Sequence, residues 1–502
     1  MNHWIIAPVL LPAVLAPLIA AAMRHDVTLA RVFSMAGTVA LVAISLGLVG
    51  VASSGEITIY ELGNWSSPFG IVLVLDRLSA MMLLITSSLA LMVLFYTITS
   101  GWDKRGRHFH ALFQFQLMGI SGAFLTGDAF NLFVFFEVLL IASYGLMIFG
   151  GGGMRLRAGL QYVVMNLAGS TLFLIALGTL YAVTGTLNIA DLAVKVRELP
   201  MEDVALLRVA AMLLMIVFAV KAALFPVQFW LPGTYANAPA PVAAMFSIMT
   251  KVGAYAILRF FTILFGPDVA ATNSMAADWL LPAALITLAI GAIGVFGAKR
   301  LFPMAAFAVL ASMGMVMVAI ALFTPEATTA ALFYIVHSTF AAAALFLIAD
   351  LVLTNRGHDH LKPAPMMMQH GLLAAMFFTI AIAIAGMPPL AGFLGKLLVL
   401  NAAQSTPYMA VIWTVVLVAS LLMVVGFARA GSMIFWKTKT VEGDDISTAG
   451  TASIMSIGAV MVPIAGLVLL SVFAGPLSEY MQATAAQLFD PDGYINAVLG
   501  PK

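Results

Sequence analysis

Apolar stretches about as long as a bilayer is thick recur along almost the whole chain. A transmembrane helix needs roughly 20 consecutive apolar residues. Such stretches cover residues 4–23, 30–52, 77–99, 109–126, 129–150, 159–184, 204–231, 236–262, 274–297, 301–323, 326–354, 370–402, 408–436 and 450–474. The pattern predicts an all-α polytopic membrane protein with about 14 transmembrane helices.

Three segments stand apart from this pattern. Between the second and third predicted helices, the alternation at 57–60 predicts a short surface hairpin. The tail after Gly475 has a mixed composition, and we expect it at the surface. The first apolar segment, 4–23, lacks a basic region before it and a small-residue cleavage site after it, so we expect a retained first span.

Prolines interrupt two of the predicted helices. One break lies near 221–232, with Pro226 and Pro232, and the other lies near 386–396. Proline removes a backbone donor and clashes with the preceding turn, so a break at membrane depth needs other protein or a water-lined cavity around it. Each break has a lysine beside it, Lys221 in one half of the chain and Lys396 in the other. This arrangement is typical of internally repeated transporters with discontinuous helices at their ion sites.

Composition narrows the possible chemistry. Of 502 residues, 63% are hydrophobic and 9% are charged, which excludes an ordinary soluble domain. The absence of cysteine excludes disulfides, thiolate-held iron–sulfur clusters and cysteine nucleophiles. The sequence contains no dinucleotide fingerprint or phosphate loop, and the net charge of +1 without a basic run gives no sign of nucleic acid. We therefore expect no cofactor and no resident metal, and any redox or ATP chemistry would belong to a partner.

Loop charges predict an orientation. Under a count of fourteen spans, one side of the membrane carries Arg24, Arg31, Lys104, Arg105, Arg107, Arg155, Arg157, Lys299, Arg300, Arg356, Lys362, Lys437 and Lys439. The other side carries mainly Glu56, Glu61, Asp128, Glu202, Asp203, Asp268 and Glu326, with Lys195, Arg197 and Arg208 as exceptions. Because basic loops stay in the cytoplasm, both termini are expected to be extracytoplasmic.

Glu137 is the most informative single residue. It lies in the middle of the apolar segment 131–144, and a carboxylate at bilayer depth is costly and therefore usually has a partner and a function. Lys221, Lys251, His337 and Lys396 also lie within long apolar stretches. Together they suggest a proton relay. The alternative for Glu137 is a structural ion pair or a carboxyl kept neutral by burial.

Lys221 is the natural partner of Glu137. A nearby carboxylate stabilises the protonated form of a buried lysine, so opening of the pair would release the proton and closing would reload it. The alternative is that Lys221 extends its ammonium group to a water boundary. Its position before the proline break, well inside the span, favours the relay.

The remaining candidates differ in strength. Lys251 lies mid-span, and His337 can exchange protons near neutral pH, although a lone buried histidine is as often structural. Lys396 is a candidate terminal donor toward the opposite side. We expect Asp128 to cap a helix; Arg259, Asp350 and Arg429 are expected at membrane boundaries. Side chains that could hold channel water are His110, Gln114, Gln116, Asn166, Ser170 and Thr171.

Three separated motifs resemble one family. The segment 128–144 resembles the fifth-helix signature of the antiporter-like proton-translocating membrane subunits, which occur in respiratory complex I, membrane hydrogenases and Mrp-type multisubunit cation/proton antiporters. The breaks at 221–232 and 386–396 match the family's broken seventh and twelfth helices. Within the family, the stretch 250–259 and the length are most similar to the D subunits of the Mrp-type (Mnh, Pha) Na⁺(K⁺)/H⁺ antiporters. Lysine at 396 is unlike the complex I subunit that carries an acid there.

The resemblance implies a fold and a domain division. It implies two inverted five-helix repeats and a horizontal polar axis through the membrane plane. We expect an N-terminal three-helix segment with a short extracytoplasmic hairpin at 1–108, repeats at 109–262 and 263–436, and a last helix with its tail at 437–502. One departure concerns Ala341, where several relatives carry a second lysine; the central relay would then rest on His337 and water.

Three functions compete. The first is the proton-conducting subunit of a monovalent cation/proton antiporter in the bacterial cytoplasmic membrane, with other subunits handling Na⁺ or K⁺. The second is a redox-driven proton-pumping subunit of a complex I-type NADH:quinone oxidoreductase or a membrane hydrogenase. The third, a stand-alone solute transporter, lacks a pocket signature. Hard cations prefer oxygen ligands, and no carboxylate cluster lies within the spans, which favours a cation path in another subunit.

Overall fold

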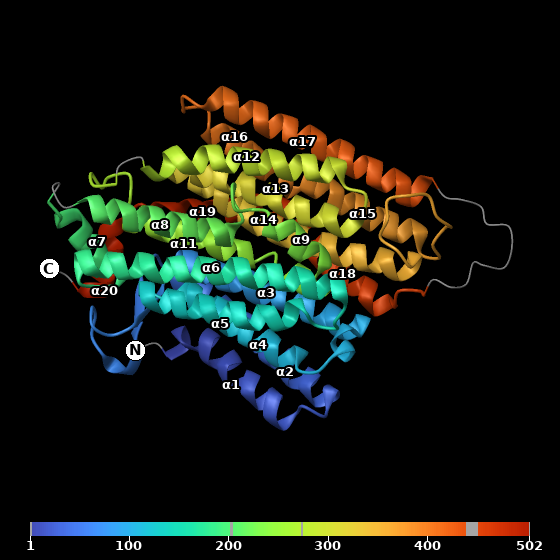
Figure 1. Ribbon diagram of the computed structural model, residues 1–502, viewed down its shortest axis with the longest axis horizontal. Helices are drawn as coiled ribbons and strands as arrows, with labels where there is room; N and C mark the ends of the chain where they lie inside the picture. Colours follow the sequence, from blue (N-terminus) through green and yellow to red (C-terminus); the bar gives the residue numbers. More distant parts are fainter. Residues whose placement is uncertain (1–2, 201–203, 273–274, 438–449, 501–502) are drawn as a thin grey trace.

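Long helices lying side by side make up nearly all of this computed structural model (Figure 1). The structure describes residues 3–200, 204–272, 275–437 and 450–500. Three of the loop charges, Glu202, Asp203 and Lys439, lie outside the described residues. The ends of the chain lie at the same end of the helix bundle, on the left of Figure 1.

The main helices follow the predicted spans closely. They are α1 (Ala7–Ala22), α2 (Val27–Ala52), α3 (Arg77–Ser100), α4 (Phe109–Leu125), α5 (Ala129–Met147), α6 (Gly153–Thr184), α8 (Val204–Ala222), α9 (Trp230–Asn237), α10 (Ala240–Met245), α11 (Met249–Ile263), α12 (Met275–Gly297), α13 (Leu301–Ile320), α14 (Pro325–Arg356), α15 (His370–Ala385), α16 (Ala391–Ala402), α17 (Met409–Gly431) and α18 (Ile454–Val472). Shorter elements are η1 (His3–Ile5), η2 (Leu62–Asn64), η3 (Trp102–Arg105), η4 (Ser432–Trp436), α7 (Ile189–Glu198), α19 (Ala474–Leu488) and α20 (Pro491–Leu499).

Eleven helices among the described residues are long and apolar enough to cross a membrane, with α10 and α11 taken together as one. Three further apolar units, namely α1, α4 and the interrupted pair α15–α16, are shorter. The prediction of an all-α polytopic membrane protein is confirmed. The number of fourteen spans agrees with these units together and stays a prediction.

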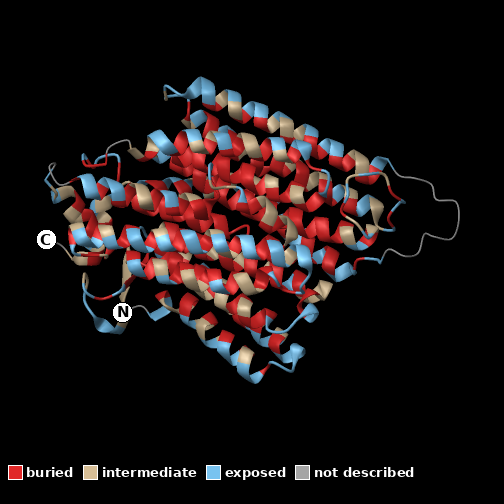
Figure 2. Ribbon diagram, viewed as in Figure 1, coloured by how far each residue is buried: buried red, intermediate tan, exposed pale blue. Residues whose placement is uncertain are grey.

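The centre of the bundle is formed by α10, α11, α13 and α14. Every residue of α10 and α11 and nearly every residue of α14 is buried, and Figure 2 shows the buried residues concentrated in these central helices. In contrast, α1, α2, α6 and α17 keep an apolar face exposed, as expected for helices that face lipid or neighbouring subunits. The central helices carry Lys251 and His337.

Paired glycines bring two helix pairs into very close contact in the same way. A Cβ on Gly119 of α4 would lie 2.5 Å from the backbone nitrogen of Leu139 on α5, and a Cβ on Gly291 of α12 would meet the backbone nitrogen of Ala311 on α13 at least as closely. One turn along each helix, Gly122 faces Phe135 and Gly294 faces Phe307. The sequence separations match in the two halves, which supports the two-repeat prediction; the repeats themselves stay a prediction.

Two peripheral predictions have different outcomes. The predicted hairpin forms, with β1 (Thr58–Glu61) antiparallel to β2 (Val72–Leu75), but β2 is buried rather than at the surface. The tail after Gly475 lies at the surface as predicted, with one face buried. That segment folds into α19 and α20, and α19 packs on α14 and α3 because Met481, Ala485 and Leu488 form an apolar stripe.

Both predicted breaks are present, and protein groups serve the backbone atoms that they free. At the first break, between α8 and α9, the Val220 carbonyl accepts from Trp230 Nε1 at 3.1 Å. The Phe225 amide donates to Thr287 of α12 at 2.8 Å. At the second break, between α15 and α16, the Ala385 carbonyl accepts from Lys396 Nζ at 2.7 Å.

Candidate functional site

Glu137 and Lys221 each form a hydrogen bond with a side chain of α6. Glu137, on α5, accepts a hydrogen bond from the Ser170 hydroxyl. Lys221, in the last turn of α8, donates from Nζ to Asn166 Oδ1 at 3.1 Å. Asn166 and Ser170 lie one turn apart on α6 and therefore share a face. In the described part of the chain no ion pair within 4 Å joins Glu137 to Lys221, so the two charges are held apart.

The orientation of Asn166 is fixed by its own helix. Its Nδ2 donates to the Tyr162 carbonyl at 2.8 Å, which turns Oδ1 toward the lysine. The ammonium group also lies 5.7 Å from the ring centre of Phe136, the residue before Glu137. The alternative that Lys221 reaches a water boundary is not supported, because its side chain is buried.

Close helix contact places Lys251 near the first break. A Cβ on Gly253 would lie 2.6 Å from the Ala222 nitrogen, so α11 packs directly against the end of α8. Lys251 is fully buried. Within the described residues, its Nζ and the adjacent Thr250 hydroxyl make no hydrogen bond. A buried ammonium without a partner is costly, which points to water at this position.

His337 lies at the centre of α14 beside the second break. Its ring is hydrogen-bonded to the backbone of Ala383, and a Cβ on Gly392 of α16 would come within 2.8 Å of Nε2. The other nitrogen, Nδ1, has no partner among the described residues. A cavity of about 10 Å³, enough for roughly one water, is bounded by His337, Ser338, Ala341 and Ala342. Ala341 is one of the residues that bound this cavity.

Lys396 folds back over the second break. Its Nζ donates to the Ala385 carbonyl and, at 3.0 Å, to Ser420 of α17. A Cβ on Gly386 would lie within 3.0 Å of its Cδ, Cε and Nζ. Gly386 has φ 76° and ends α15, so a glycine is needed there for both conformation and space. All five relay candidates are thus at least partly buried. Within the described residues, Glu137 and Lys221 alone among them bond to side chains of one shared helix, α6.

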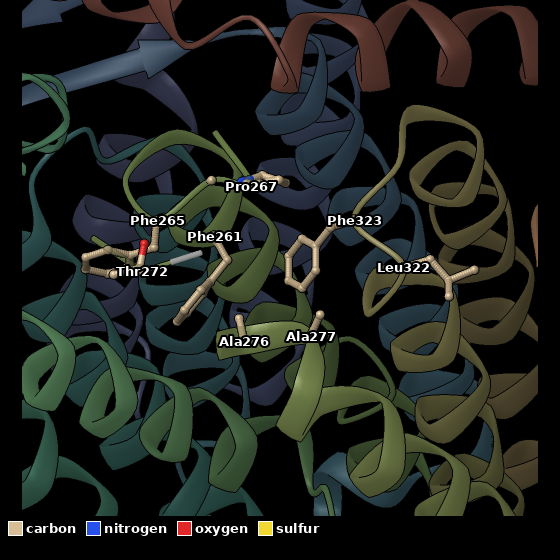
Figure 3. A pocket seen from close by; sticks show the side chains of 9 residues that line it. Phe261, Phe265, Pro267, Thr272, Ala276, Ala277, Leu322 and Phe323 are labelled. Atoms are coloured by element: carbon tan, nitrogen blue, oxygen red, sulfur yellow. The ribbon is translucent and has the colours of Figure 1, made fainter. Parts of the chain in front are cut away.

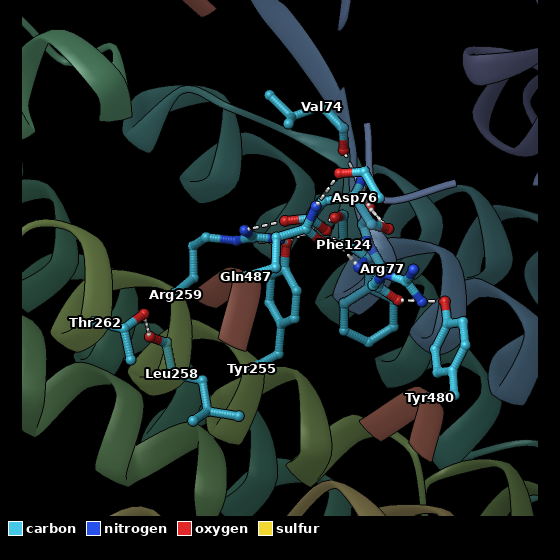
Figure 4. A network of polar contacts seen from close by, with 12 residues as sticks. Val74, Asp76, Arg77, Phe124, Tyr255, Leu258, Arg259, Thr262, Tyr480 and Gln487 are labelled. Carbon is cyan, nitrogen blue, oxygen red and sulfur yellow. Dashed lines mark hydrogen bonds and ion pairs between the residues drawn. The ribbon is translucent and has the colours of Figure 1, made fainter. Parts of the chain in front are cut away.

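Two predicted boundary charges are buried. Arg259 forms a buried ion pair with Asp76, the residue that caps α3, and also donates to Tyr255 (Figure 4). Asp350 accepts hydrogen bonds from Tyr96 and Trp102, each at 2.7 Å. Their position at the membrane boundary stays a prediction, but their burial and their partners, which are distant in sequence, were not predicted. The sequence analysis did not identify Asp76 as a buried partner, although its spacing from Ser79 is that of a capping box.

The water-holding candidates divide into three groups. Asn166 and Ser170 join the Glu137–Lys221 site. Gln114 bonds to Ser34 and Thr38 of α2, and Thr171 bonds only to its own helix on an exposed face. Gln116 is buried, and neither of its side-chain atoms has a partner in the described structure.

Outside the spans, two aspartates have structural roles. Asp128 accepts from the Asn131 amide, which confirms it as the cap of α5. Asp103, in η3, binds Arg31 through two hydrogen bonds of 2.6 and 2.8 Å and contacts His110. Burial alone would raise the pKa of Asp103, but the Arg31 and His110 contacts outweigh burial and lower the pKa to about 2. This places His110 in a structural contact.

One well-formed pocket contains no charged group. Phe261, Phe265, Phe323 and Thr272 are among the residues that line this cavity beyond the end of α11 (Figure 3). None of its lining residues is acidic or basic. It therefore offers a proton or a metal cation no charged ligand.

Ionisable groups held this deep in an apolar bundle, beside helix breaks, define a class of protein: ion-translocating membrane proteins. A sequence model of the family described as "NADH:quinone oxidoreductase/Mrp antiporter, TM" matches residues 126–423. The chain belongs to this family, and it is a multi-pass membrane protein.

Similar proteins extend the match over the whole chain. A Rhizobium meliloti protein named as the D subunit of a probable K(+)/H(+) antiporter is 38% identical, covering 99% of this chain and 98% of that protein. The D subunit of the Na(+)/H(+) antiporter of Alkalihalophilus pseudofirmus is also 38% identical, covering 99% and 100%. A chain from the structure of the Mrp complex of Dietzia sp. has a TM-score of 0.90 at 28% identity, with 100% of both chains covered.

Proposed function

We propose that this chain is the proton-translocating subunit of a multisubunit monovalent cation/proton antiporter. The observation that carries the proposal is the full-length similarity to antiporter D subunits, combined with buried lysines beside both helix breaks. Its substrates are H⁺ and Na⁺ or K⁺. Its partners are the other subunits of the complex, toward which the exposed apolar faces of the outer helices could turn.

Protons move along Glu137, Lys221, Lys251, His337 and Lys396. The best-supported step is the first. Because Glu137 and Lys221 are bound to neutral side chains of α6, either can move toward the other without first breaking an ion pair. Approach stabilises the charged lysine, and separation favours release of its proton toward Lys251. Water connects the later groups; Lys251 Nζ and His337 Nδ1, which have no partner among the described residues, support this.

The basic loops give the orientation in the bacterial cytoplasmic membrane. Arg155 donates to the Asn237 carbonyl at 3.0 Å, and residues Trp102, Arg155, Arg300 and Asp359 line one pocket, so these connections gather at one end of the bundle. We call it the basic end. Positively charged loops favour the cytoplasm, and both termini are then extracytoplasmic.

The domain division follows the same proposal. Residues 1–108 form an N-terminal unit, 109–262 and 263–436 form two inverted five-helix repeats, and 437–502 form the last helix and tail. The matching glycine contacts of α4–α5 and α12–α13 support the two repeats. Each repeat then contains one broken helix with its lysine.

A second candidate is a redox-driven proton pump, since the family description includes NADH:quinone oxidoreductase. The relay would be the same, but the energy would come from electron transfer in a partner. The lysine at 396 and the names of the relatives favour the antiporter.

Cation-induced proton efflux in everted vesicles tests the proposal. The vesicles contain this chain with its operon partners in an antiporter-deficient host; respiration builds the pH gradient and is then inhibited before Na⁺ or K⁺ is added. The antiporter collapses the gradient on cation addition, and Lys221→Ala abolishes the response. Absence of any cation response in an assembled complex, with pumping that follows electron flow, would favour the redox pump.

A further inference from the structure

A polar pocket opens at the basic end of the bundle, away from the five relay candidates. Its volume is about 370 Å³, which exceeds what one water needs many times over. Seven polar or aromatic side chains line it: Trp102, Arg155, Asn237, Arg300, Phe302, Asp350 and Asp359. The pocket therefore joins both halves of the chain at the face where the basic loops gather.

Asp350 differs from the other buried aspartates. The described structure buries four of them: Asp76, Asp103, Asp350 and Asp359. Three are ion-paired, with Arg259, Arg31 and Arg300 respectively. Asp350 has no cation within 4 Å in the described residues and accepts only from the neutral donors Tyr96 and Trp102, both through Oδ2. In this respect it resembles Glu137, which accepts from a serine hydroxyl.

Positively charged side chains lie near Asp350 but form no ion pair with it. Tyr96 reaches it from α3 and Trp102 from η3. Arg105 lies 3.6 Å and Arg155 5.7 Å from the Trp102 ring centre, and both act on the carboxylate at a distance. On the α13 side Arg300 is engaged by Asp359. A carboxylate in such a setting can exist in its charged form and still accept a proton, because no arginine occupies its oxygens.

Asp350 lies on the same helix as His337. The residues Ser338, Ala342, Phe346 and Asp350 follow one another at i+4 spacing and share one side of α14. The cavity beside His337 reaches Ala342, and the pocket at the basic end reaches Asp350. About 12 Å of helix lie between these two positions. Of these four residues, Phe346 lies between the cavity beside His337 and the pocket at the basic end. Its ring lies 6.3 Å from that of Tyr235 on α9.

We propose that Asp350 exchanges protons with solvent at the basic end and that Phe346 is the apolar barrier between Asp350 and His337. In the direction that the vesicle assay measures, the Phe346 ring moves aside and protonated His337 passes its proton through water to the Asp350 carboxylate. The Asp350 carboxyl group then gives the proton to a water molecule in the pocket, which leaves as hydronium, and becomes a carboxylate again. This inference deepens the proposed function and rests on it. Tyr235 connects the barrier to the helix that follows the Lys221 break.

The competing explanation is that Asp350 has only a structural role, in which its hydrogen bonds hold α14 against α3 and η3. Asparagine separates the two roles, because its carbonyl oxygen accepts the same two hydrogen bonds but cannot exchange a proton. In the vesicle assay Asp350→Asn should lower the rate per assembled complex at least tenfold, while Asp350→Glu should retain part of it. The control is Asp103→Asn, a buried aspartate outside the pocket, whose rate per assembled complex should stay within about twofold.

These outcomes separate the two proposals. A cation response in wild type with an unimpaired Asp350→Asn variant overturns the proton-exchange site and leaves the antiporter function standing. No cation response in assembled wild type overturns the antiporter function instead. Phe346→Ala tests the barrier: the complex should lose a preset pH gradient several-fold faster without any cation, and a gradient as stable as in wild type overturns the barrier.

Cysteine labelling tests from which side of the membrane the pocket is accessible. It needs neither a transport measurement nor the Asp350 variants. Because the chain has no cysteine, Leu353→Cys in the pocket and Ala277→Cys in the apolar pocket at the other end give single thiols. A membrane-impermeant cationic thiol reagent should label Leu353→Cys in everted vesicles and Ala277→Cys only in right-side-out ones. Failure to label Leu353→Cys from the cytoplasmic side, including labelling from outside alone, overturns the cytoplasmic proton-exchange site.

Discussion

Asn166 and Ser170, one turn apart on α6, bind opposite charges: Asn166 accepts from Lys221 at 3.1 Å, and Ser170 donates to Glu137. A direct ion pair in a low-dielectric interior would hold both side chains tightly. A hydrogen bond between a charged and a neutral group contributes about 1.5–3 kcal/mol, less than the roughly 3–5 kcal/mol that breaking a buried ion pair costs, so the charges are stabilised without being fixed to each other. The helix between them is therefore part of the proposed switch.

Removing the charge of Glu137 should disable that switch. Glu137→Gln keeps an acceptor for Ser170 but loses the carboxylate that stabilises protonated Lys221, so cation-induced proton efflux should fall at least tenfold. The rate is measured per assembled complex in everted vesicles. Glu137→Asp, which keeps the charge, should lose less. Near-normal exchange in an assembled Glu137→Gln complex would contradict the pair model.

Asn166 should matter more than its neighbours on α6. Asn166→Ala removes the acceptor that holds the Lys221 ammonium group away from Glu137, which favours a persistent ion pair. We expect transport to fall roughly three- to tenfold. Thr171→Ala is the matched control, since Thr171 bonds only to the Leu167 carbonyl of its own helix on an exposed face. Equal rates for the two variants would remove α6 from the mechanism.

The close contact between α8 and α11 beside the first break is a separate requirement for transport and stability. An alanine at 253 would place its Cβ 2.6 Å from the Ala222 nitrogen, so α8 and α11 must move apart. Gly253→Ala should therefore reduce transport and lower the midpoint of thermal unfolding, at a cost of roughly 1–3 kcal/mol for overpacking. Gly178→Ala on α6 is the control, because nothing lies within 4 Å of its added Cβ. The control should behave as wild type, and matching losses in both would refute the requirement for close contact.

The helices and the broken segments could be predicted because their signals are local. Apolar length defines a span, and proline beside lysine at 221–232 and 386–396 marks a break. The burial of Lys221 and Lys396 follows from the same pattern. Where a side chain's environment depends on the next few residues, as for the Asp128 cap, sequence reasoning was sufficient.

Contacts between distant segments could not be predicted in this way. Arg259 lies 183 residues from Asp76, and Tyr96 lies 254 residues before Asp350, so their charges were assigned to the membrane boundary. The polar links of α6 also depend on helix packing. A usable signal was nevertheless present in the glycines: Gly119 and Gly122 recur as Gly291 and Gly294, the same spacing in each half.

The Arg31–Asp103 pair should make the protein sensitive to acid. The pKa of Asp103 is about 2 in the folded chain against an ordinary 3.8. Because the folded pKa is the lower one, the pair stabilises fully above about pH 4 and loses its contribution as the pH falls toward 2. Asp103→Asn should cost roughly 1–3 kcal/mol at neutral pH. The difference in unfolding midpoint from wild type, measured in detergent, should shrink between pH 5 and pH 2.5; a constant difference would contradict the ion-pair origin.

Lys396 should be required for proton exit but not for assembly. Its Nζ is bound to the Ala385 carbonyl freed by the break and to Ser420, so it is positioned at the last helix of the proposed relay. Lys396→Ala should abolish transport while the complex still assembles. Lys396→Arg keeps the hydrogen bonds but cannot release its proton, so it should be equally inactive. Activity of the arginine variant would assign Lys396 to holding the break, and unchanged transport in the alanine variant would place the exit elsewhere.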